Sequence, residues 1–181
     1  MLPDIEVLKG HVTEVHGSPN SGKTRALLSY IKELQTRQEA LAYFIDAASK
    51  LGAAATKEKN IWFSFNINSK DELALMDIAC KYLDIVIIDD ATYIHGDLWH
   101  FMSNLKRVAQ NRNVAVIVIN QKRFVLNHKT NTYEYLPYRF NIMRRYCTYA
   151  WDVDTNEWME LNPPDTTSHF DDFTQLLLKG A

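Results

Sequence analysis

Apolar residues follow two alternating patterns along this chain. Strands are predicted where β-branched residues are frequent or apolar residues are nearly continuous, at residues 12–16, 40–46, 61–65, 84–90 and 114–119. Between these runs, apolar residues recur every three or four positions, which is the spacing of an amphipathic helix. Helices are predicted at residues 25–35, 71–82 and 97–110, with a short one in 50–60. Alternating strands and helices predict an α/β fold, in which a parallel sheet has helices on both faces.

The pattern changes after Gln121. Residues 133–138 and 140–152 alternate between apolar and polar, and a turn signal follows at residues 154–156. We therefore predict that this half of the chain is antiparallel and packs on one edge of the sheet. A last short helix is predicted at residues 170–179.

Residues 17–24, with the sequence GSPNSGKT, match the phosphate-binding loop pattern G-x-x-x-x-G-K-[ST] at every fixed position. Glycines let backbone N–H groups point at a phosphate, and the following helix N-terminus attracts an anion. The motif predicts ATP and Mg²⁺ as cofactors, with Lys23 on the β- and γ-phosphates and the Thr24 hydroxyl on the metal. The nucleotide-binding residues expected are Gly17, Ser18, Pro19, Asn20, Ser21, Gly22, Lys23, Thr24 and Arg25.

A glycine and polar residues lie at the carboxyl ends of the predicted strands, where parallel sheets bind their ligands. They are Gly17, Asp46, Asp89 and Gln121. Asp89 closes an apolar strand, as the metal-binding acid of phosphate-loop proteins does. We therefore expect Thr24 and Asp89 to hold Mg²⁺.

Composition and charge add constraints. The net charge of −2 hides a basic stretch, residues 122–145, which carries six cations and one acid, so the rest of the chain carries −7. A basic region on an acidic protein predicts an anionic partner met at one place. No apolar run approaches the roughly 20 residues of a membrane span, and the N-terminus lacks a signal-peptide pattern. The two isolated cysteines are expected to be buried thiols, and residues 1–181 to form one domain.

These motifs together resemble the RecA/RadA recombinase family. Residues 9–17 look like the family's lead into its phosphate loop, residues 43–47 like its second strand, and residues 60–89 like its third strand, helix and metal-binding strand. Residues 118–121, with the sequence VINQ, are similar to the motif that senses the γ-phosphate and connects it to the second DNA-binding loop. The resemblance implies a RecA-like core with an antiparallel C-terminal edge, and catalytic roles for Lys23 and Gln121.

The basic stretch corresponds in place to that second DNA-binding loop. Cations that follow phosphates, interleaved with aromatic residues that stack on bases, suit single-stranded DNA. Alternating aromatic residues are equally what a half-buried hairpin needs, so this alternative stays open. The DNA-binding residues implied are Arg123, Lys129, Arg139, Arg144 and Arg145.

The departures from the family also carry information. The family's water-activating glutamate is replaced by Ala48, so ATP hydrolysis is expected to be slow, with Asp90 as the candidate replacement base. Only a stub at residues 92–96 can represent the first DNA-binding loop. We expect no N-terminal domain and no segment for linking subunits into filaments. These features resemble the short eukaryotic recombinase paralogues, which act as mediators on recombinase filaments.

Three functions follow as hypotheses. The first is an ATP-binding mediator of homologous recombination and DNA repair, in a hetero-complex with a RecA-like recombinase or another paralogue. It would be located in the nucleus if eukaryotic and otherwise in the cytoplasm. The second is a minimal phage-type recombinase, a DNA-dependent ATPase that forms its own filament. The third is a nucleoside kinase of related core, such as thymidine kinase, against which the lack of a cysteine-rich zinc ribbon counts.

Overall fold

The computed structural model describes residues 2–37, 40–47, 51, 60–64, 80–94, 96–127 and 129–162. The strands are β1 (Val12–Gly17), β2 (Ala42–Asp46), β3 (Ile61–Ser64), β4 (Ile85–Asp89), β5 (Ala115–Asn127), β6 (Thr132–Pro137), β7 (Tyr149–Asp152) and β8 (Glu157–Glu160). The helices are α1 (Ile5–Leu8), α2 (Lys23–Arg37), α4 (Leu98–Arg112), α5 (Phe140–Tyr146) and the 3₁₀ helix η2 (Ala91–Tyr93).

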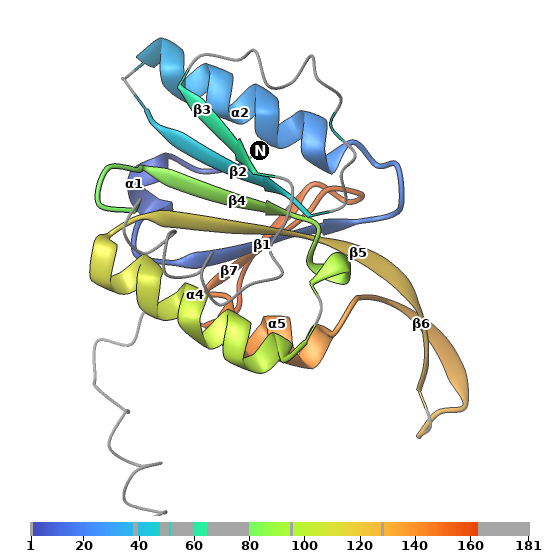
Figure 1. Ribbon diagram of the computed structural model, residues 1–181. Helices are drawn as coiled ribbons and strands as arrows, with labels where there is room; N and C mark the ends of the chain where they lie inside the picture. The colour runs from blue at the N-terminus through green and yellow to red at the C-terminus, as the bar shows by residue number, and fades with distance from the viewer. Residues whose placement is uncertain are drawn as a thin grey trace, which may run out of the picture.

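The strands form one twisted sheet in the order β3-β2-β4-β5-β1-β7-β8. All neighbours from β3 to β7 pair in parallel, and β8 returns antiparallel to β7. Helices α1 and α2 cover one face, while α4 and α5 cover the other (Figure 1). This is the predicted α/β phosphate-loop fold, with the carboxyl ends of β1, β2, β4 and β5 at one edge.

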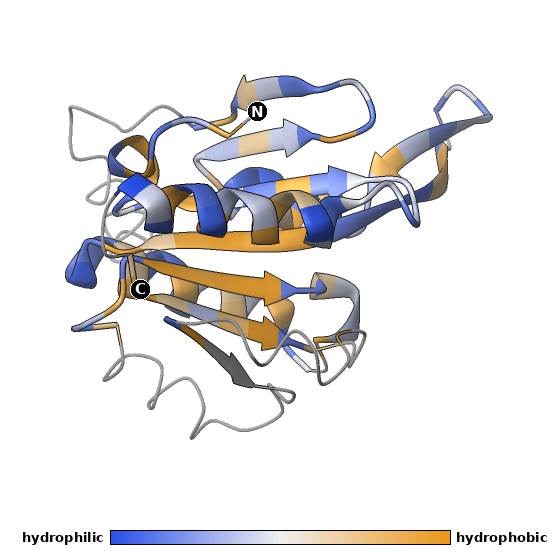
Figure 2. Cartoon of the chain, turned by 90° about the horizontal axis from the view of Figure 1, so that it is seen from above, coloured by the Kyte–Doolittle hydropathy of each residue, from blue (hydrophilic) through white to orange (hydrophobic). Residues whose placement is uncertain are grey.

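Both faces of the sheet are buried, which explains the continuous apolar runs in the sequence. Strand β4 illustrates this, because Ile85 and Ile87 pack in the core under α2, whereas Val86 and Ile88 pack in the core against α4. Figure 2 shows these central strands as predominantly hydrophobic. The resulting two-sided core fixes the strand register that brings the site residues together.

The prediction for residues 140–152 is wrong in part. Phe140–Tyr146 is helix α5, and Ile142 and Met143 are buried against α4. Its apolar residues fit a helical face as well as a strand, so their alternation did not separate the two states. Strand β7 is parallel to β1, whereas β6 and β8 are antiparallel to their partners as expected, and of these two β8 lies at the edge of the main sheet.

Strand β5 is much longer than predicted. It continues past the sheet to Asn127 and pairs with β6 in an antiparallel hairpin that projects from the body (Figures 1 and 2). We call β6 and residues 122–127 of β5 the basic hairpin. It does not pack along the sheet edge, contrary to the expectation from its alternating pattern.

Some predictions lie outside the described residues. These are the helix within 50–60, most of the helix at 71–82, the helix at 170–179 and the residue Ala48. Within the described part of the chain, no helix is both long and apolar enough to cross a membrane. Cys80 and Cys147 are buried free thiols, as expected.

Helix α4 begins at an Asp97 cap. The Asp97 carboxylate accepts hydrogen bonds from the backbone N–H groups of Trp99 and His100, at 3.0 and 3.2 Å. We expect Asp97→Ala to lower the free energy of unfolding by about 1 kcal/mol, which corresponds to a fall of about 2–4 °C in Tm. Asp97→Asn keeps the cap and should stay near the wild-type Tm in thermal unfolding followed by circular dichroism. Equal losses in both variants would contradict the capping role.

Candidate functional site

The phosphate-binding loop connects β1 to α2, as the motif predicts. Gly22 has φ +86°, a conformation that glycine adopts without strain. Gly17 is required for space, because a Cβ there would lie 2.8 Å from Ser21 Oγ and 3.1 Å from Asp154 Oδ1. A pocket of about 480 Å³ opens at the loop. Its lining comprises Pro19, Asn20, Gly22, Lys23, Thr24, Arg25, Asp89 and Gln121.

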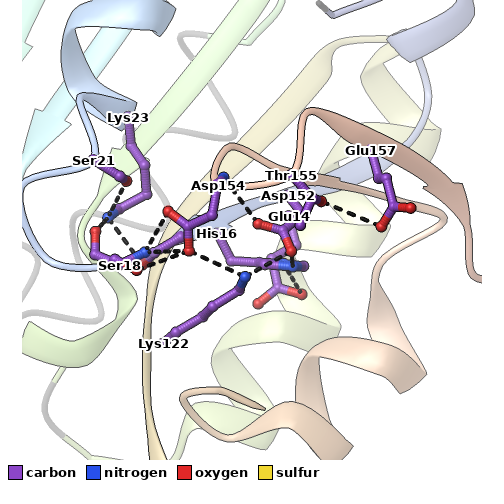
Figure 3. Close-up of polar contacts among 11 residues, drawn as sticks. Glu14, His16, Ser18, Ser21, Lys23, Lys122, Asp152, Asp154, Thr155 and Glu157 are labelled. Carbon is purple, nitrogen blue, oxygen red and sulfur yellow. Dashed lines mark hydrogen bonds and ion pairs between the residues drawn. The ribbon is translucent and has the colours of Figure 1, made fainter. Parts of the chain in front are cut away.

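The lysine of the loop is buried at this pocket. Its Nζ donates hydrogen bonds to the carbonyl oxygens of Gly17 and Ser18, at 3.1 and 2.7 Å, and to Ser21 Oγ at 3.3 Å (Figure 3). A cation held this way needs only a side-chain rotation to meet a phosphate in the same pocket. This geometry fits the role predicted for Lys23.

The two residues predicted to hold Mg²⁺ are in contact. Thr24 Oγ1 donates a hydrogen bond of 2.5 Å to Asp89 Oδ2, and both residues line the pocket. A hydroxyl and a carboxylate beside a phosphate site are the hard oxygen ligands that Mg²⁺ prefers, with the remaining positions left to water and phosphate. The donor set therefore fits Mg²⁺, and Thr24 and Asp89 are the residues that would hold it.

Asp90 lies behind the pocket rather than in its lining. It is fully buried, and its Oδ1 accepts hydrogen bonds from Thr92 N and Thr92 Oγ1 at 2.8 and 2.6 Å. Its Oδ2 accepts from Gln121 Nε2. Gln121 itself lines the pocket. Asp90 therefore holds the Gln121 amide by a hydrogen bond, and its role as a base stays a prediction.

The other strand-end acid, Asp46, meets the same edge of the sheet. It pairs in register with Asp89 and is buried, and its Oδ2 accepts a hydrogen bond of 2.6 Å from Leu51 N. Gly17 likewise pairs in register with Gln121. The predicted convergence of Gly17, Asp46, Asp89 and Gln121 is thus confirmed.

Sequence reasoning missed an acid that holds the loop. Asp154, in the turn between β7 and β8, accepts hydrogen bonds from Ser18 N at 2.9 and 3.0 Å and from Ser18 Oγ at 2.8 Å (Figure 3). Lys122 Nζ lies 3.1 Å from Asp154 Oδ2 and 2.6 Å from Asp152 Oδ2. In the sequence, Asp154 belongs to the turn signal at residues 154–156, and nothing in that signal pointed to the phosphate loop.

These contacts set the charges of the group. Burial alone would raise the pKa of the Asp154 carboxyl, but hydrogen bonds from Ser18 and Lys122 outweigh it and lower that pKa. Burial would lower the pKa of Lys122, yet its hydrogen bonds to Asp152 and Asp154 raise it. The ion pair between Lys122 and Asp154 is therefore fully charged around neutral pH.

Four of the five predicted DNA-binding residues, all except Lys129, lie near the root of the basic hairpin. A groove of about 370 Å³ lies between the hairpin, the start of α4 and the start of α5. We call it the arginine–aromatic groove; its lining includes Trp99, Arg123, Arg139 and Phe140. The Arg145 guanidinium lies 5.4 Å from the Trp99 ring centroid and that of Arg144 lies 5.7 Å from Phe140. Lys129 lies apart from the groove, at the hairpin turn.

The opposite side of the basic hairpin carries aromatic residues. Phe124 and Tyr135 pair across the strands with ring centroids 4.8 Å apart. Phe124 and Tyr133 are each 71% exposed, far more than a packed hairpin requires. Half-buried packing therefore does not account for the exposure of these two side chains.

Comparisons with known proteins agree with this core. A family model described as thymidine kinase matches residues 10–142, more than half of the chain, from the lead into β1 to the start of α5. The DNA repair and recombination protein RadB of Methanosphaera stadtmanae is 28% identical over 140 residues, covering 62% of this chain. The chain spans 60% of that relative. This similarity supports the RecA-like resemblance but does not single out the eukaryotic paralogues.

Proposed function

The chain belongs to the thymidine kinase family, and from that premise we propose that it binds ATP with Mg²⁺. We propose further that it uses the nucleotide in DNA recombination and repair. In this proposal the bound nucleotide controls how tightly the basic hairpin binds single-stranded DNA. In the sequence analysis, the lack of a cysteine-rich zinc ribbon counted against a thymidine kinase core. The family match shows that this lack does not exclude such a core. The recombination role is proposed from the similarity to RadB.

The continuity of β5 carries this proposal. One strand passes from the sheet core through the buried Asn120 and through Gln121, which lines the nucleotide pocket, directly into the basic hairpin. Tyr138, at the other end of the hairpin, donates its N–H to the carbonyl of Gln121, and its own carbonyl accepts from Asn120 Nδ2. A change at the γ-phosphate position therefore acts on both strands of the hairpin at their root.

The residues of the pocket divide the work of the proposed reaction. Lys23 neutralises the β- and γ-phosphates, and Thr24 and Asp89 hold the Mg²⁺ that supplies charge neutralisation. The Gln121 amide, fixed by Asp90, orients a water toward the γ-phosphorus. The water oxygen forms the new bond to phosphorus, the bond to the bridging oxygen of the β-phosphate breaks so that ADP leaves with that oxygen, and the water proton passes to an oxygen of the released phosphate. With Ala48 where the recombinase family has its glutamate, we propose that turnover lies below the usual 1–10³ s⁻¹.

The proposed partners are single-stranded DNA and a second RecA-like chain. The groove combines arginines, which follow phosphates, with Trp99 and Phe140, on which bases stack. A protein with slow turnover that holds DNA in an ATP-dependent way suits a mediator of a recombinase filament better than the recombinase itself. Long filaments of this chain alone on single-stranded DNA, seen by light scattering, would contradict the mediator role.

The proposed DNA binding is tested with variants of the arginine–aromatic groove. We expect Trp99→Ala to weaken binding of an oligothymidine strand by about 1–3 kcal/mol, because a stacked base is lost. Arg139→Ala should flatten the log–log salt dependence of the affinity by about 0.7, because one phosphate contact is lost. Fluorescence anisotropy measures both, and ATP affinity should not change in either variant. The exposed Lys81, at the opposite edge of the sheet, provides the control Lys81→Ala.

A nucleoside kinase is the second candidate function. The family match favours it, and so does a pocket of about 420 Å³ beside Thr24 and Arg25, adjoining the phosphate site, where an acceptor hydroxyl could sit. The two functions separate in one assay, in which the protein is incubated with Mg²⁺, ATP and thymidine or another deoxynucleoside. Formation of a nucleoside monophosphate at a rate above that of phosphate release would establish the kinase and displace the first proposal.

A further inference from the structure

A continuous polar path joins the basic hairpin to the lysine of the phosphate loop. Lys122, the residue after Gln121 at the root of the hairpin, contacts Asp154, and Asp154 binds the N–H and hydroxyl of Ser18 (Figure 3). The carbonyl of the same Ser18 accepts the 2.7 Å hydrogen bond from Lys23 Nζ. Two lysines, one from the hairpin and one from the nucleotide pocket, thus act on a single residue of the loop.

Three features make this path more than a surface contact. The Lys122 side chain is only 10% exposed, and its ion pair with the 11% exposed Asp152 is shielded from solvent and from salt. Asp154 engages both of its oxygens on Ser18, which fixes the direction of the first peptide of the loop. Gly17 lets the loop lie close to Asp154, because a Cβ at this position would come within 3.1 Å of Asp154 Oδ1.

The charges of Lys122, Asp152 and Asp154 would also affect the binding of a triphosphate at the loop. Asp152 and Asp154 place two carboxylates behind a loop that must receive an anion, and Lys122 neutralises them in part. His16 lies behind the same group, 3.9 Å from Asp152 Oδ2 and 3.4 Å from Glu14 Oε2. Loss of the Lys122 charge would leave the carboxylates to repel the phosphates and would free Asp154 to move.

We propose that Lys122 and Asp154 are positioning residues for the phosphate loop, and that they make its nucleotide affinity depend on what the basic hairpin holds. Single-stranded DNA that immobilises the hairpin root keeps Lys122 on Asp154, which keeps Ser18 and the loop in place for ATP. The effect is reciprocal, because coupling between two binding sites acts equally in both directions. The coupling half of this inference rests on the proposed function, whereas the positioning half does not.

The test measures affinity for a fluorescent ATP analogue with Mg²⁺, with and without saturating oligothymidine. In the wild type we expect DNA to tighten nucleotide binding at least fivefold, within the usual range of such couplings. In Lys122→Met we expect about tenfold weaker nucleotide binding without DNA, and less than a twofold effect of DNA. DNA affinity measured without nucleotide should stay within about threefold of wild type, since Lys122 is buried on the carboxylates rather than in the groove.

Matched variants separate positioning from general damage. Lys122→Arg keeps a cation at this place and should restore most of the coupling, which a merely structural loss would not do. Asp154→Asn keeps one acceptor oxygen for Ser18 and removes the charge, so its effect on coupling should not add to that of Lys122→Met in the double variant. Lys81→Met and Glu160→Gln, at exposed positions away from the loop, should behave as wild type. Thermal unfolding confirms that each variant is folded.

Each outcome decides a different claim. If the wild type binds nucleotide and DNA but shows no coupling, or if Lys122→Met keeps the coupling, the inference is overturned. If Lys122→Met and Asp154→Asn both bind the nucleotide as wild type does, the positioning role fails. If the wild type binds no DNA at all, the proposed function fails, and the affinities of the variants for the nucleotide alone still decide the positioning role.

Discussion

The Lys23→Ala variant is expected to bind ATP with Mg²⁺ about 10- to 150-fold more weakly than the wild type. A charge-assisted contact at a buried site contributes about 1.5–3 kcal/mol, and about 1.4 kcal/mol corresponds to a factor of ten in affinity. Lys23 is 7% exposed and its Nζ donates to the carbonyls of Gly17 and Ser18, which places its charge inside the loop. Arg25, the other cation of the described lining, belongs to the first turn of α2. Isothermal titration of the full chain with a non-hydrolysable ATP analogue measures the change.

The control for this prediction is Lys81→Ala, which removes the same charge at the opposite edge of the sheet. The Lys23→Ala protein should also keep its DNA affinity in the absence of nucleotide, because the arginine–aromatic groove lies on other elements. Unchanged ATP affinity in Lys23→Ala would refute the assignment of residues 17–24 as a phosphate-binding loop. It would remove the basis of both candidate functions.

For Gln121→Ala we expect a fall of about 10²–10³ in ATP turnover, the loss typical of one oriented group in a transition state. The affinity for ATP should change much less, because Lys23, Thr24 and Asp89 hold the triphosphate and its metal. Gln121 is the amide that the pocket presents next to Asp89, and Asp90 fixes its direction. Phosphate release in single turnover, with oligothymidine present, separates the chemical step from product release.

Asp90→Asn distinguishes the two roles considered for Asp90. Asparagine keeps one acceptor oxygen, which can take the place of Oδ2 and accept from Gln121 Nε2, so a pure anchor should lose less turnover than Gln121→Ala does. A base would lose about 10²–10⁴ on the same substitution, because an amide takes no proton. Full loss in Asp90→Asn with little loss in Gln121→Ala would therefore restore the prediction made from the sequence, that Asp90 is the base.

The core of the site could be predicted because its residues are fixed by local rules. The loop motif places Lys23 and Thr24 on one turn, and the end of an apolar strand places Asp89 opposite them. Parallel pairing then brings strand ends to one edge, as the register of Gly17 with Gln121 and of Asp46 with Asp89 confirms. Each of these steps needs only short-range sequence information together with the general geometry of α/β sheets.

Other parts of the site depend on contacts between distant segments and could not be predicted in this way. Asp154 reaches Ser18 across 136 positions of the chain, and no periodicity encodes such a pair. The alternating residues of the basic hairpin resemble an edge strand, because exposure of both faces and burial of one face give similar patterns. Helix α5 was missed because its few apolar residues fit both periods, and packing on α4 decided between them.

Because β5 extends beyond the sheet, a small rotation at its root would move the tip of the basic hairpin by a larger distance. Residues 122–127 extend roughly 20 Å from the sheet at about 3.4 Å per residue, and their partner strand stiffens them over the same span. A tilt of about 10° at the fulcrum beside Gln121 would move the hairpin tip by about 3.5 Å, roughly the rise of one residue in a strand. A rotation of β5 that is too small to disturb the core beside the nucleotide pocket would thus displace the hairpin tip by about the stacking distance between neighbouring bases.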